Sequence, residues 1–332
     1  KPLLKFERLL KTYVFSAPKG IQSYMRSIPL WLGEKIFQKK MIYHDLKKID
    51  KNFNGYNKIK FSEHHFSHAA SAFYPSPFKE AIILTLDGVG EKATTTIAIG
   101  KENKIEIKKE IHFPHSLGLL YSAFTYYLGF KVNSGEYKVM GLAPYGVPKF
   151  KEKILKNLVE VREDGSFFLN MKYFNYQTGF TMISENFSKL FEKPVRKRDQ
   201  MLTQFHMDLA ASIQVVLEEI ILKICENVKM EYGITNLCLA GGVALNCVVN
   251  GKILKKGIFE NVWIQPAAGD AGGSLGAALA YWHIDLNKDR VNSTKDNMQG
   301  SYLGNNFSDD EIKIILNDIG AEFTEMSEEE II

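Results

Sequence analysis

The sequence predicts an α/β fold. Three β-rich runs at residues 81–87, 94–100 and 104–113 are separated only by the short loops GVGEKA and KEN, which is typical of a three-stranded meander. A helical pattern follows at residues 116–130, and strands then alternate with helices between residues 201 and 283. The prediction depends on this order of elements.

The predicted helices have apolar residues at a period near 3.6 and end at residues that break helices. The pattern predicts helices within residues 3–50, interrupted at SAPKG, over residues 63–73 before Pro75 and Pro77, and over residues 201–232 before Gly233. The segments NLCLA and NVWIQP each predict a strand that runs into a glycine turn and then a helix. Residues 131–200 are loop-rich and follow neither period, so no element is predicted there.

The order of elements is that of one ribonuclease-H-like half of the actin/Hsp70/sugar-kinase (ASKHA) superfamily, an analogy of topology alone. We expect residues 1–80 to be the helical remainder of an incomplete first subdomain. Residues 81–283 would form the second subdomain, with an insertion at about 147–200. Residues 284–332 have the pattern of a polar linker followed by the start of another domain. Because the chain begins with Lys1 and ends in SEEEII, we expect a piece of a longer protein.

The composition is that of a globular protein, with 45% hydrophobic and 24% charged residues. No apolar run approaches the roughly 18 residues of a membrane span, and the first residues do not form a secretory signal. The three cysteines form no C-x-x-C pair, so we expect reduced thiols and a cytoplasmic protein. The net charge is +4, and the excess of lysine and arginine in residues 1–60 fits a solvated helix face better than a nucleic-acid site.

A pair of histidines is the first candidate for chemistry. His64 and His68 are four residues apart, so on a helix both imidazoles project from one face and can reach one metal ion. A buried or capping histidine is the alternative.

Asp87 ends an apolar strand and is followed by Gly88 and Gly90, which let backbone N–H groups approach an anion. A hairpin turn is the alternative there.

The same pattern of strand, aspartate and glycine recurs near the end of the α/β region. Asp270 follows the strand VWIQP, and Gly272 and Gly273 open a helix whose N-terminal dipole attracts phosphate. Gly241 and Gly242, in the turn LAGGVALN, offer a backbone surface for a nucleotide, with tight helix–strand packing as the alternative.

Convergence of these candidates would give two imidazoles and two carboxylates, a nitrogen and oxygen site suited to iron, zinc or manganese. Its task would be to polarise an oxygen. Two other classes of active site are excluded because their motifs are missing, namely the G-x-x-x-x-G-K-[ST] loop of P-loop nucleotidases and the G-x-S-x-G elbow of serine hydrolases.

Five stretches, HHFSHAASAFYPSPF, LDGVGE, GEYKVMGLAPYG, LAGGVALNC and GDAGGSLGAAL, resemble the NodU/CmcH family of O-carbamoyltransferases. This family includes tobramycin carbamoyltransferase and is similar here to the universal tRNA threonylcarbamoyltransferase. The stretches occur in family order over roughly residues 62–280, and together they are highly specific. Residues 1–61 resemble the family's helical segment more loosely.

The resemblance implies an ATP-dependent reaction in two stages. A separate domain similar to the YrdC fold, which residues 284–332 would begin, makes carbamoyl-adenylate from carbamoyl phosphate and ATP. The present domain then moves the carbamoyl group to a hydroxyl of a small sugar-like or secondary-metabolite acceptor. Carbamoyl phosphate, ATP and this acceptor are thus the implied partners, a homodimer is an open alternative, and no membrane partner is expected.

Site residues are implied by the same resemblance. The metal ligands would be His64, His68, Asp87 and Asp270, commonly holding iron, with zinc, manganese or magnesium as alternatives. The nucleotide, as ATP or carbamoyl-adenylate, would be held in the turns of Gly88, Gly90, Gly241, Gly242, Asn246, Gly272 and Gly273. Glu136 and Lys138 would address phosphate or acceptor as catalytic residues, with a structural ion pair between them as the alternative.

Two departures from the family stand out. Nothing in residues 1–60 matches its opening strand and His-Asp-Ser-Ala turn, and the adenylate-making domain is all but absent, so we expect the chain alone to be an incomplete enzyme. Three other functions stay open: a tRNA N6-threonylcarbamoyladenosine transferase, a sugar kinase of the ASKHA superfamily, and a nucleotide-sensing module without catalysis.

Overall fold

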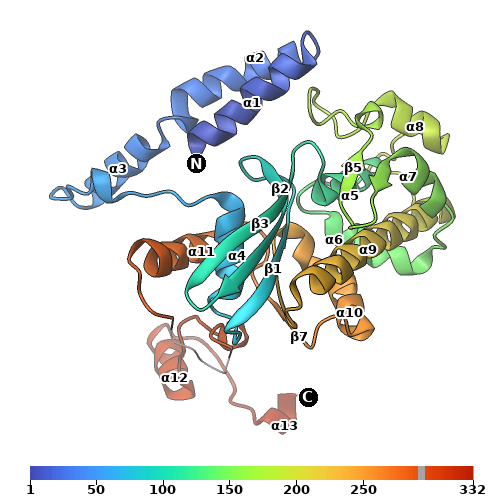
Figure 1. The fold of residues 1–332 in the computed structure, drawn as a ribbon. Coiled ribbons are helices and arrows are strands. Elements are labelled where there is room, and N and C mark those ends of the chain that lie inside the picture. Colours follow the sequence, from blue (N-terminus) through green and yellow to red (C-terminus); the bar gives the residue numbers. More distant parts are fainter. Residues whose placement is uncertain (291–295, 332) are drawn as a thin grey trace. The chain divides into compact units, whose positions relative to one another are not determined.

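The computed structural model describes residues 1–290 and 296–331. The chain divides into two compact units, Lys1–Asn297 and Met298–Ile332. The smaller unit contains helices α12 (Asp309–Asp318) and α13 (Glu328–Ile331), and all strands of the described residues lie in the larger one (Figure 1). The predicted domain boundaries near residues 80 and 283 stay predictions, and residues 291–295 of the expected linker lie outside the described residues.

A mixed five-stranded sheet, in the order β3-β2-β1-β6-β7, forms the centre of the larger unit. Strands β1, β2 and β3 are antiparallel neighbours, whereas β1, β6 and β7 run parallel. The strands are β1 (Glu80–Leu86), β2 (Ala93–Lys101), β3 (Lys104–His112), β6 (Asn236–Ala240) and β7 (Asn261–Ile264). The α/β fold, the meander and the two later strands are therefore confirmed.

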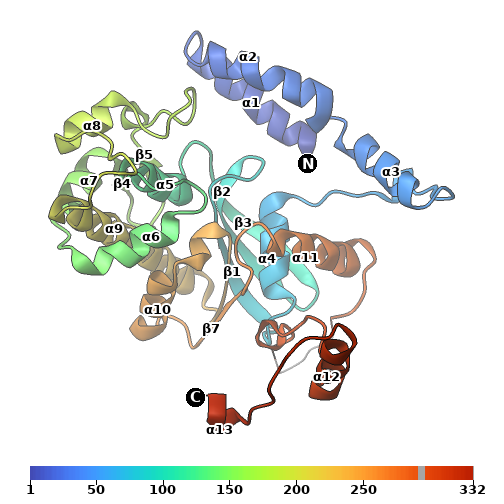
Figure 2. The same ribbon diagram turned by 180° about the vertical axis from the view of Figure 1, so that it is seen from behind.

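Helices cover both faces of this sheet (Figures 1 and 2). Strand β1 shows why, because its side chains alternate between two cores. Ile82 and Leu84 pack in the core that holds α5 (Leu117–Tyr127), α9 (Gln204–Tyr232) and α10 (Cys247–Lys256). Ala81 and Ile83 face the smaller core with α4 (His64–Phe73) and α11 (Gly272–Ala280). A strand that is buried on both faces reads as a nearly continuous apolar run, as AIILTL does apart from Thr85.

Helix α9 is the longest element of the described residues and behaves as its sequence predicts. Thr203 and His206 form a capping box at its N-terminus. Gly233, with a φ of 69°, ends it in the left-handed conformation that glycine adopts without strain. Its apolar stripe, from Leu209 to Val228, is buried in the larger core.

Residues 131–200, for which the sequence predicts no element, contain several short ones. They are α6 (Glu136–Leu142), α7 (Lys151–Asn157), the hairpin of β4 (Val159–Val161) and β5 (Phe167–Leu169), and α8 (Glu185–Phe191). Helices of seven residues and strands of three are too short to show a period. Tertiary packing supports them instead, since Phe187 and Phe191 of α8 contact Phe124 and Tyr127 of α5.

The N-terminal segment is helical, as predicted, with its break at residues 17–20. Helices α1 (Pro2–Ser16), α2 (Ile21–Leu30) and α3 (Gln38–Ile49) contain no buried residue. Shorter 3₁₀ and π segments occur at Trp31–Lys35, Tyr56–Lys58, Ala143–Tyr145, Met171–Tyr173, Gly242–Leu245, Tyr281–Asp285 and Gln299–Ser301. In the described part of the chain, every helix is too short or too polar to cross a bilayer.

Helices α4 and α11 pack against each other at unusually close range. A Cβ atom placed on Gly276 of α11 would collide with the backbone carbonyl oxygen of Ser67 in α4. Glycine at this position therefore lets the backbones touch, and the distance between the two helices depends on it.

Gly276→Ala should therefore destabilise the protein by about 1–3 kcal/mol, because the helices must move apart to admit the methyl group. Gly251→Ala is the matched control, since Gly251 lies within α10 and its added Cβ would meet no atom within 4 Å. That control should be stabilising by roughly 0.5–1 kcal/mol through helix propensity. Urea unfolding measures both, and equal free energies of unfolding for the two variants would contradict the packing argument.

Candidate metal centre

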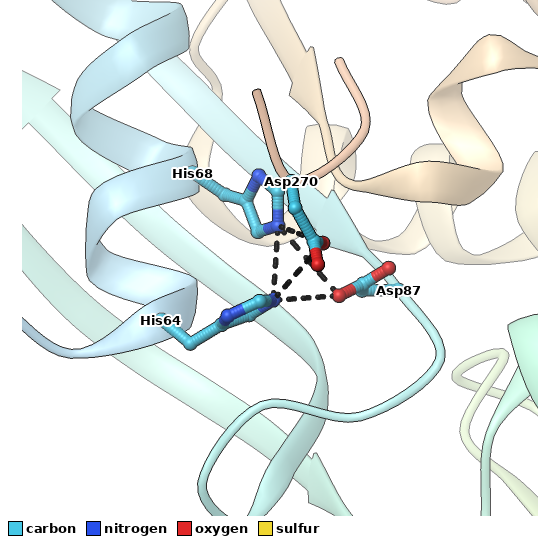
Figure 3. A group of neighbouring side chains, drawn as sticks. All are labelled: His64, His68, Asp87 and Asp270. Atoms are coloured by element: carbon cyan, nitrogen blue, oxygen red, sulfur yellow. Dashed lines mark hydrogen bonds and ion pairs between the residues drawn. The ribbon is translucent and has the colours of Figure 1, made fainter. Parts of the chain in front are cut away.

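Two imidazoles meet at the start of α4. His64 and His68 lie one turn apart on the same helical face, and their Nε2 atoms are 3.1 Å apart (Figure 3). The first turn is held by Glu91, whose carboxylate accepts a hydrogen bond of 2.9 Å from the backbone N–H of His64. The helix thus delivers both rings to the end of β1, as the spacing of four residues predicts.

Two carboxylates complete the group. Asp87 Oδ2 lies 2.7 Å from His64 Nε2 and 3.6 Å from His68 Nε2. Asp270 Oδ1 lies 3.7 Å from His64 Nε2 and 4.0 Å from His68 Nε2. One ligand atom from each residue can be chosen so that all four lie within 4.8 Å of one another. The structure therefore brings together the four residues that the sequence singles out as metal ligands.

The charge of Asp87 is fixed by its surroundings. Burial alone would raise the pKa of this carboxyl group, but hydrogen bonds from His64 and His68 outweigh burial and hold the pKa far below its usual range. Its other oxygen, Oδ1, accepts a hydrogen bond of 3.2 Å from the backbone N–H of Gly242. Asp87 is therefore ionised and held in a fixed orientation.

This donor set fits a divalent metal ion. Metal bonds of about 2.0–2.2 Å to nitrogen and oxygen place neighbouring ligand atoms roughly 3–3.5 Å apart, close to most of the separations found here. The side chain of Asp270 is 79% exposed, whereas that of His68 is 1% exposed, so His64, His68 and Asp87 line the inner side of the cluster and Asp270 lies on its outer side. Two imidazoles and two carboxylates suit iron, zinc or manganese.

The neighbouring His65 points away from this cluster. Its Nδ1 lies 2.9 Å from Thr85 Oγ1 and 2.8 Å from Thr96 Oγ1, so it joins α4 to strands β1 and β2. Burial lowers the pKa of His65 to about 4, which leaves the ring neutral. Its role here is to hold α4 on the sheet.

The loop after Asp87 forms the hairpin turn that the sequence leaves open as an alternative, and an anion contact of its glycines stays a prediction. Gly90 donates its backbone N–H to Ala93 O over 2.9 Å, which closes a hairpin between β1 and β2. A Cβ on Gly90 would lie 2.8 Å from His65 Cδ2, so glycine is needed there for packing. A Cβ on Gly88 would meet only Leu119, at 4.0 Å, which leaves room beside this residue.

The turn after β6 supports the two carboxylates. Gly241 has a φ of +91° and donates its N–H over 2.8 Å to Ala268 O, in the loop that carries Asp270. Gly242 binds Asp87 directly. Asn246 caps α10 through a 3.1 Å bond from Val249 N, and its amide pairs with the buried Gln214. A nucleotide contact of these three residues stays a prediction.

The two glycines that open α11 differ. A Cβ on Gly272 would collide with the carbonyl oxygen of Ala267, so this glycine allows the loop to close tightly. A Cβ on Gly273 would meet no atom within 4 Å. The N-terminus of α11 therefore has open space beside Gly273, whose own N–H donates a 2.6 Å hydrogen bond to Asp270 O.

Glu136 and Lys138 lie outside the four-residue cluster. The carboxylate of Glu136 accepts hydrogen bonds from Ser122 Oγ, at 2.7 Å, and from the backbone N–H groups of Asn133 and Gly135, at 3.0 and 3.1 Å. Lys138 is exposed, and within residues 1–290 and 296–331 the ion pairs do not include one between these two residues. A catalytic role for either residue stays a prediction.

Two supporting residues have no signal in the sequence. Glu91 binds the first turn of α4, and Arg8 of α1 donates a 2.7 Å hydrogen bond to Gly90 O in the loop after Asp87. Arg8 and Gly90 are 82 positions apart, and only the tertiary structure joins them.

The comparison with protein families identifies the group to which this chain is related. The family model described as "Carbamoyltransferase N-terminus" matches residues 1–279. The chain belongs to this family. The chain is also similar to the nodulation proteins NolNO and NolO, and the NodU-like resemblance is confirmed.

The curated relatives are longer than this chain. The protein sll1178 of Synechocystis sp. is 55% identical over 317 residues, which are 95% of this chain and 52% of that protein. NolNO of Sinorhizobium fredii is 40% identical over 71% of this chain and 35% of its own length. NolO of Bradyrhizobium diazoefficiens is 35% identical over 74% and 46%. The chain thus spans about half the length, or less, of these relatives.

Among solved structures, HypF of T. kodakarensis is similar to 65% of this chain, with a TM-score of 0.34 and 16% identity, and the similarity covers 36% of HypF.

The cluster predicts a specific loss on mutation. His68→Ala removes a buried imidazole of the cluster, so the affinity for Zn²⁺, measured by competition with a chromophoric chelator, should fall more than the roughly 10–100-fold that loss of an orienting residue costs. His112→Ala is the control, because this exposed histidine pairs with Glu110 on β3 and its loss should leave the affinity unchanged. Equal zinc affinities of the two variants would exclude His68 as a ligand.

Proposed function

We propose that the chain is the group-transferring part of an O-carbamoyltransferase. It would move a carbamoyl group from carbamoyl-adenylate to a hydroxyl of a sugar-like or secondary-metabolite acceptor. One observation carries the proposal: the convergence of His64, His68, Asp87 and Asp270 at one sheet edge, in a chain of the carbamoyltransferase N-terminus family.

The strand order of the sheet supports this proposal. Three antiparallel strands followed by two parallel ones, with helices on both faces, is the strand arrangement of a ribonuclease-H-like subdomain, and we assign the larger unit to that class. Parallel strands place functional loops at their carboxyl ends. Asp87, Gly242 and Asp270 all follow such ends, after β1, β6 and β7.

The residues of the chain would hold and orient the reactants. Asp87, kept ionised by the two histidines, and Asp270 would bind the metal together with these imidazoles. A bound divalent ion, iron or else zinc, manganese or magnesium, would supply a Lewis acid that polarises an oxygen of the carbamoyl-adenylate. The free space beside Gly88 and Gly273 would leave room for its phosphate near the N-terminus of α11.

The transfer itself needs no covalent enzyme intermediate. The acceptor oxygen forms a bond to the carbamoyl carbon, the bond from that carbon to the phosphate oxygen breaks, and AMP leaves with the electron pair. The hydroxyl proton is released in the same step. Backbone N–H dipoles near the phosphate favour this outcome because they stabilise the charge that AMP takes up.

The whole reaction extends beyond the residues described. Carbamoyl phosphate and ATP would be the substrates from which carbamoyl-adenylate is made, with a small hydroxylated acceptor as the third. A cytoplasmic location and a homodimer belong to the same proposal. Glu136, whose carboxylate orders the loop before α6, and the exposed Lys138 remain our candidates for contacts to phosphate or acceptor.

Binding of the nucleotide can be tested at Gly273. Gly273→Val adds a side chain where the structure has free space, so the protein should stay folded while a ligand at the N-terminus of α11 is blocked. We expect the affinity for carbamoyl-adenylate, measured by calorimetry with Mn²⁺ present, to fall at least tenfold, the factor that about 1.4 kcal/mol represents. Unchanged affinity would remove Gly273 from the nucleotide site.

Transfer can be tested on the full reading frame with carbamoyl-adenylate and a panel of sugars and aminoglycosides. Mass spectrometry should find a carbamoylated hydroxyl with the unsubstituted protein and none with Asp87→Asn, which loses a negatively charged ligand. Phosphorylated sugar formed from ATP would identify a kinase instead. Binding of tRNA that weakens steeply with salt, together with its modification, would identify the tRNA enzyme.

A further inference from the structure

The position of Asp270 depends on the loop that carries it. Asp270 is the most exposed of the four clustered residues, and it lies on the short connection from the end of β7 to the start of α11. A carboxylate on an exposed loop is not fixed in the geometry that metal binding needs unless other contacts restrain the loop. The bonds that hold this loop therefore decide whether Asp270 faces the histidines.

Gln265, the residue after β7, supplies such bonds. Its side chain is completely buried. The amide nitrogen Nε2 donates a hydrogen bond to the carbonyl oxygen of Ser71 in α4, and Oε1 accepts one of 3.1 Å from the backbone N–H of Ala267. One side chain thus ties the Asp270 loop to the helix that carries His64 and His68.

The contact on α4 lies directly beside the metal cluster. Ser71 comes three residues after His68, and its hydroxyl donates a 2.7 Å hydrogen bond to the carbonyl oxygen of His68. On the loop side, Ala267 is three residues before Asp270, and its carbonyl oxygen packs against Gly272. The chain of contacts runs from His68 through Ser71 and Gln265 to the loop of Asp270.

We propose that Gln265 is a positioning residue that sets Asp270 opposite the histidine pair and so raises the metal affinity of the site. This inference rests on the proposed metal site and adds a residue that does not touch the metal. The amide suits the position because it donates to Ser71 O and accepts from Ala267 N at once. A buried methionine would leave both backbone groups without a partner.

The test is a double-mutant cycle on Zn²⁺ affinity in the full chain. Gln265→Met keeps the length of the side chain and removes both hydrogen bonds, and we expect the affinity to fall about 10–100-fold. In an Asp270→Ala background the same substitution should change the affinity by no more than about twofold, because the residue through which it acts is gone. A merely structural role would lower the melting temperature in both backgrounds without this difference in affinity.

Asn236→Ala is the matched control. Its side-chain amide donates a 2.9 Å hydrogen bond to Glu80 O between β6 and β1, at the end of the sheet opposite the cluster. It should leave zinc affinity unchanged. If Gln265→Met does not fold, Gln265→Glu, which keeps the acceptor and loses the donor, takes its place in the cycle.

Each outcome supports the inference or overturns it. Zinc affinity of the Gln265 variant equal to that of the unsubstituted chain, or an equal loss in the Asp270→Ala background, overturns the role of Gln265 and leaves the proposed function intact. Failure of the unsubstituted chain to bind zinc overturns the metal site and this inference together. Hydrogen exchange gives a measurement without mutation, because the Ala267 amide should be protected, and fast exchange would contradict the anchor.

Discussion

The parallel pairing of β1 with β6, and of β6 with β7, is the constraint on which the candidate site depends. Parallel strands end at the same edge of a sheet, so the residues that follow them must meet there. Asp87 follows β1, Gly242 follows β6, and Asp270 follows β7, which brings positions more than 180 residues apart into contact. Helix α4 then packs on the sheet face and adds the two imidazoles. Without this pairing the four side chains would have no reason to converge.

Much of this arrangement could be predicted because its signals are local. A spacing of four residues places His64 and His68 on one helical face, and an apolar run that ends in aspartate and glycine marks a strand end. The short elements between residues 131 and 200 could not be predicted. Tertiary packing of residues such as Phe187 stabilises them, and they are too short to show a hydrophobic periodicity in the sequence. The same holds for Arg8 and Gln265, whose partners are distant in sequence.

The sequence pattern alone does not show which glycines near the site are needed for packing and which leave space for a ligand. Glycine beside an aspartate signals either a ligand or a close approach of backbones, and sequence alone does not separate the two. Gly90 and Gly272 are required by neighbouring protein atoms, namely His65 and the carbonyl oxygen of Ala267. Gly88 and Gly273 have open space instead. One motif therefore contains glycines of both kinds, and only those with open space can admit a ligand without moving the protein.

The electrostatics of the cluster explain why so many hydrogen-bond donors surround Asp87. Two carboxylates near each other repel, and the partly buried Asp87 also loses solvation, so the group is stable only while positive or donor groups surround it. The imidazoles and the N–H of Gly242 serve Asp87 in this way. Asp270 is exposed, so its carboxylate keeps its solvation. It follows that the three inner side chains are held by burial and hydrogen bonds, whereas the position of the exposed Asp270 depends on its loop.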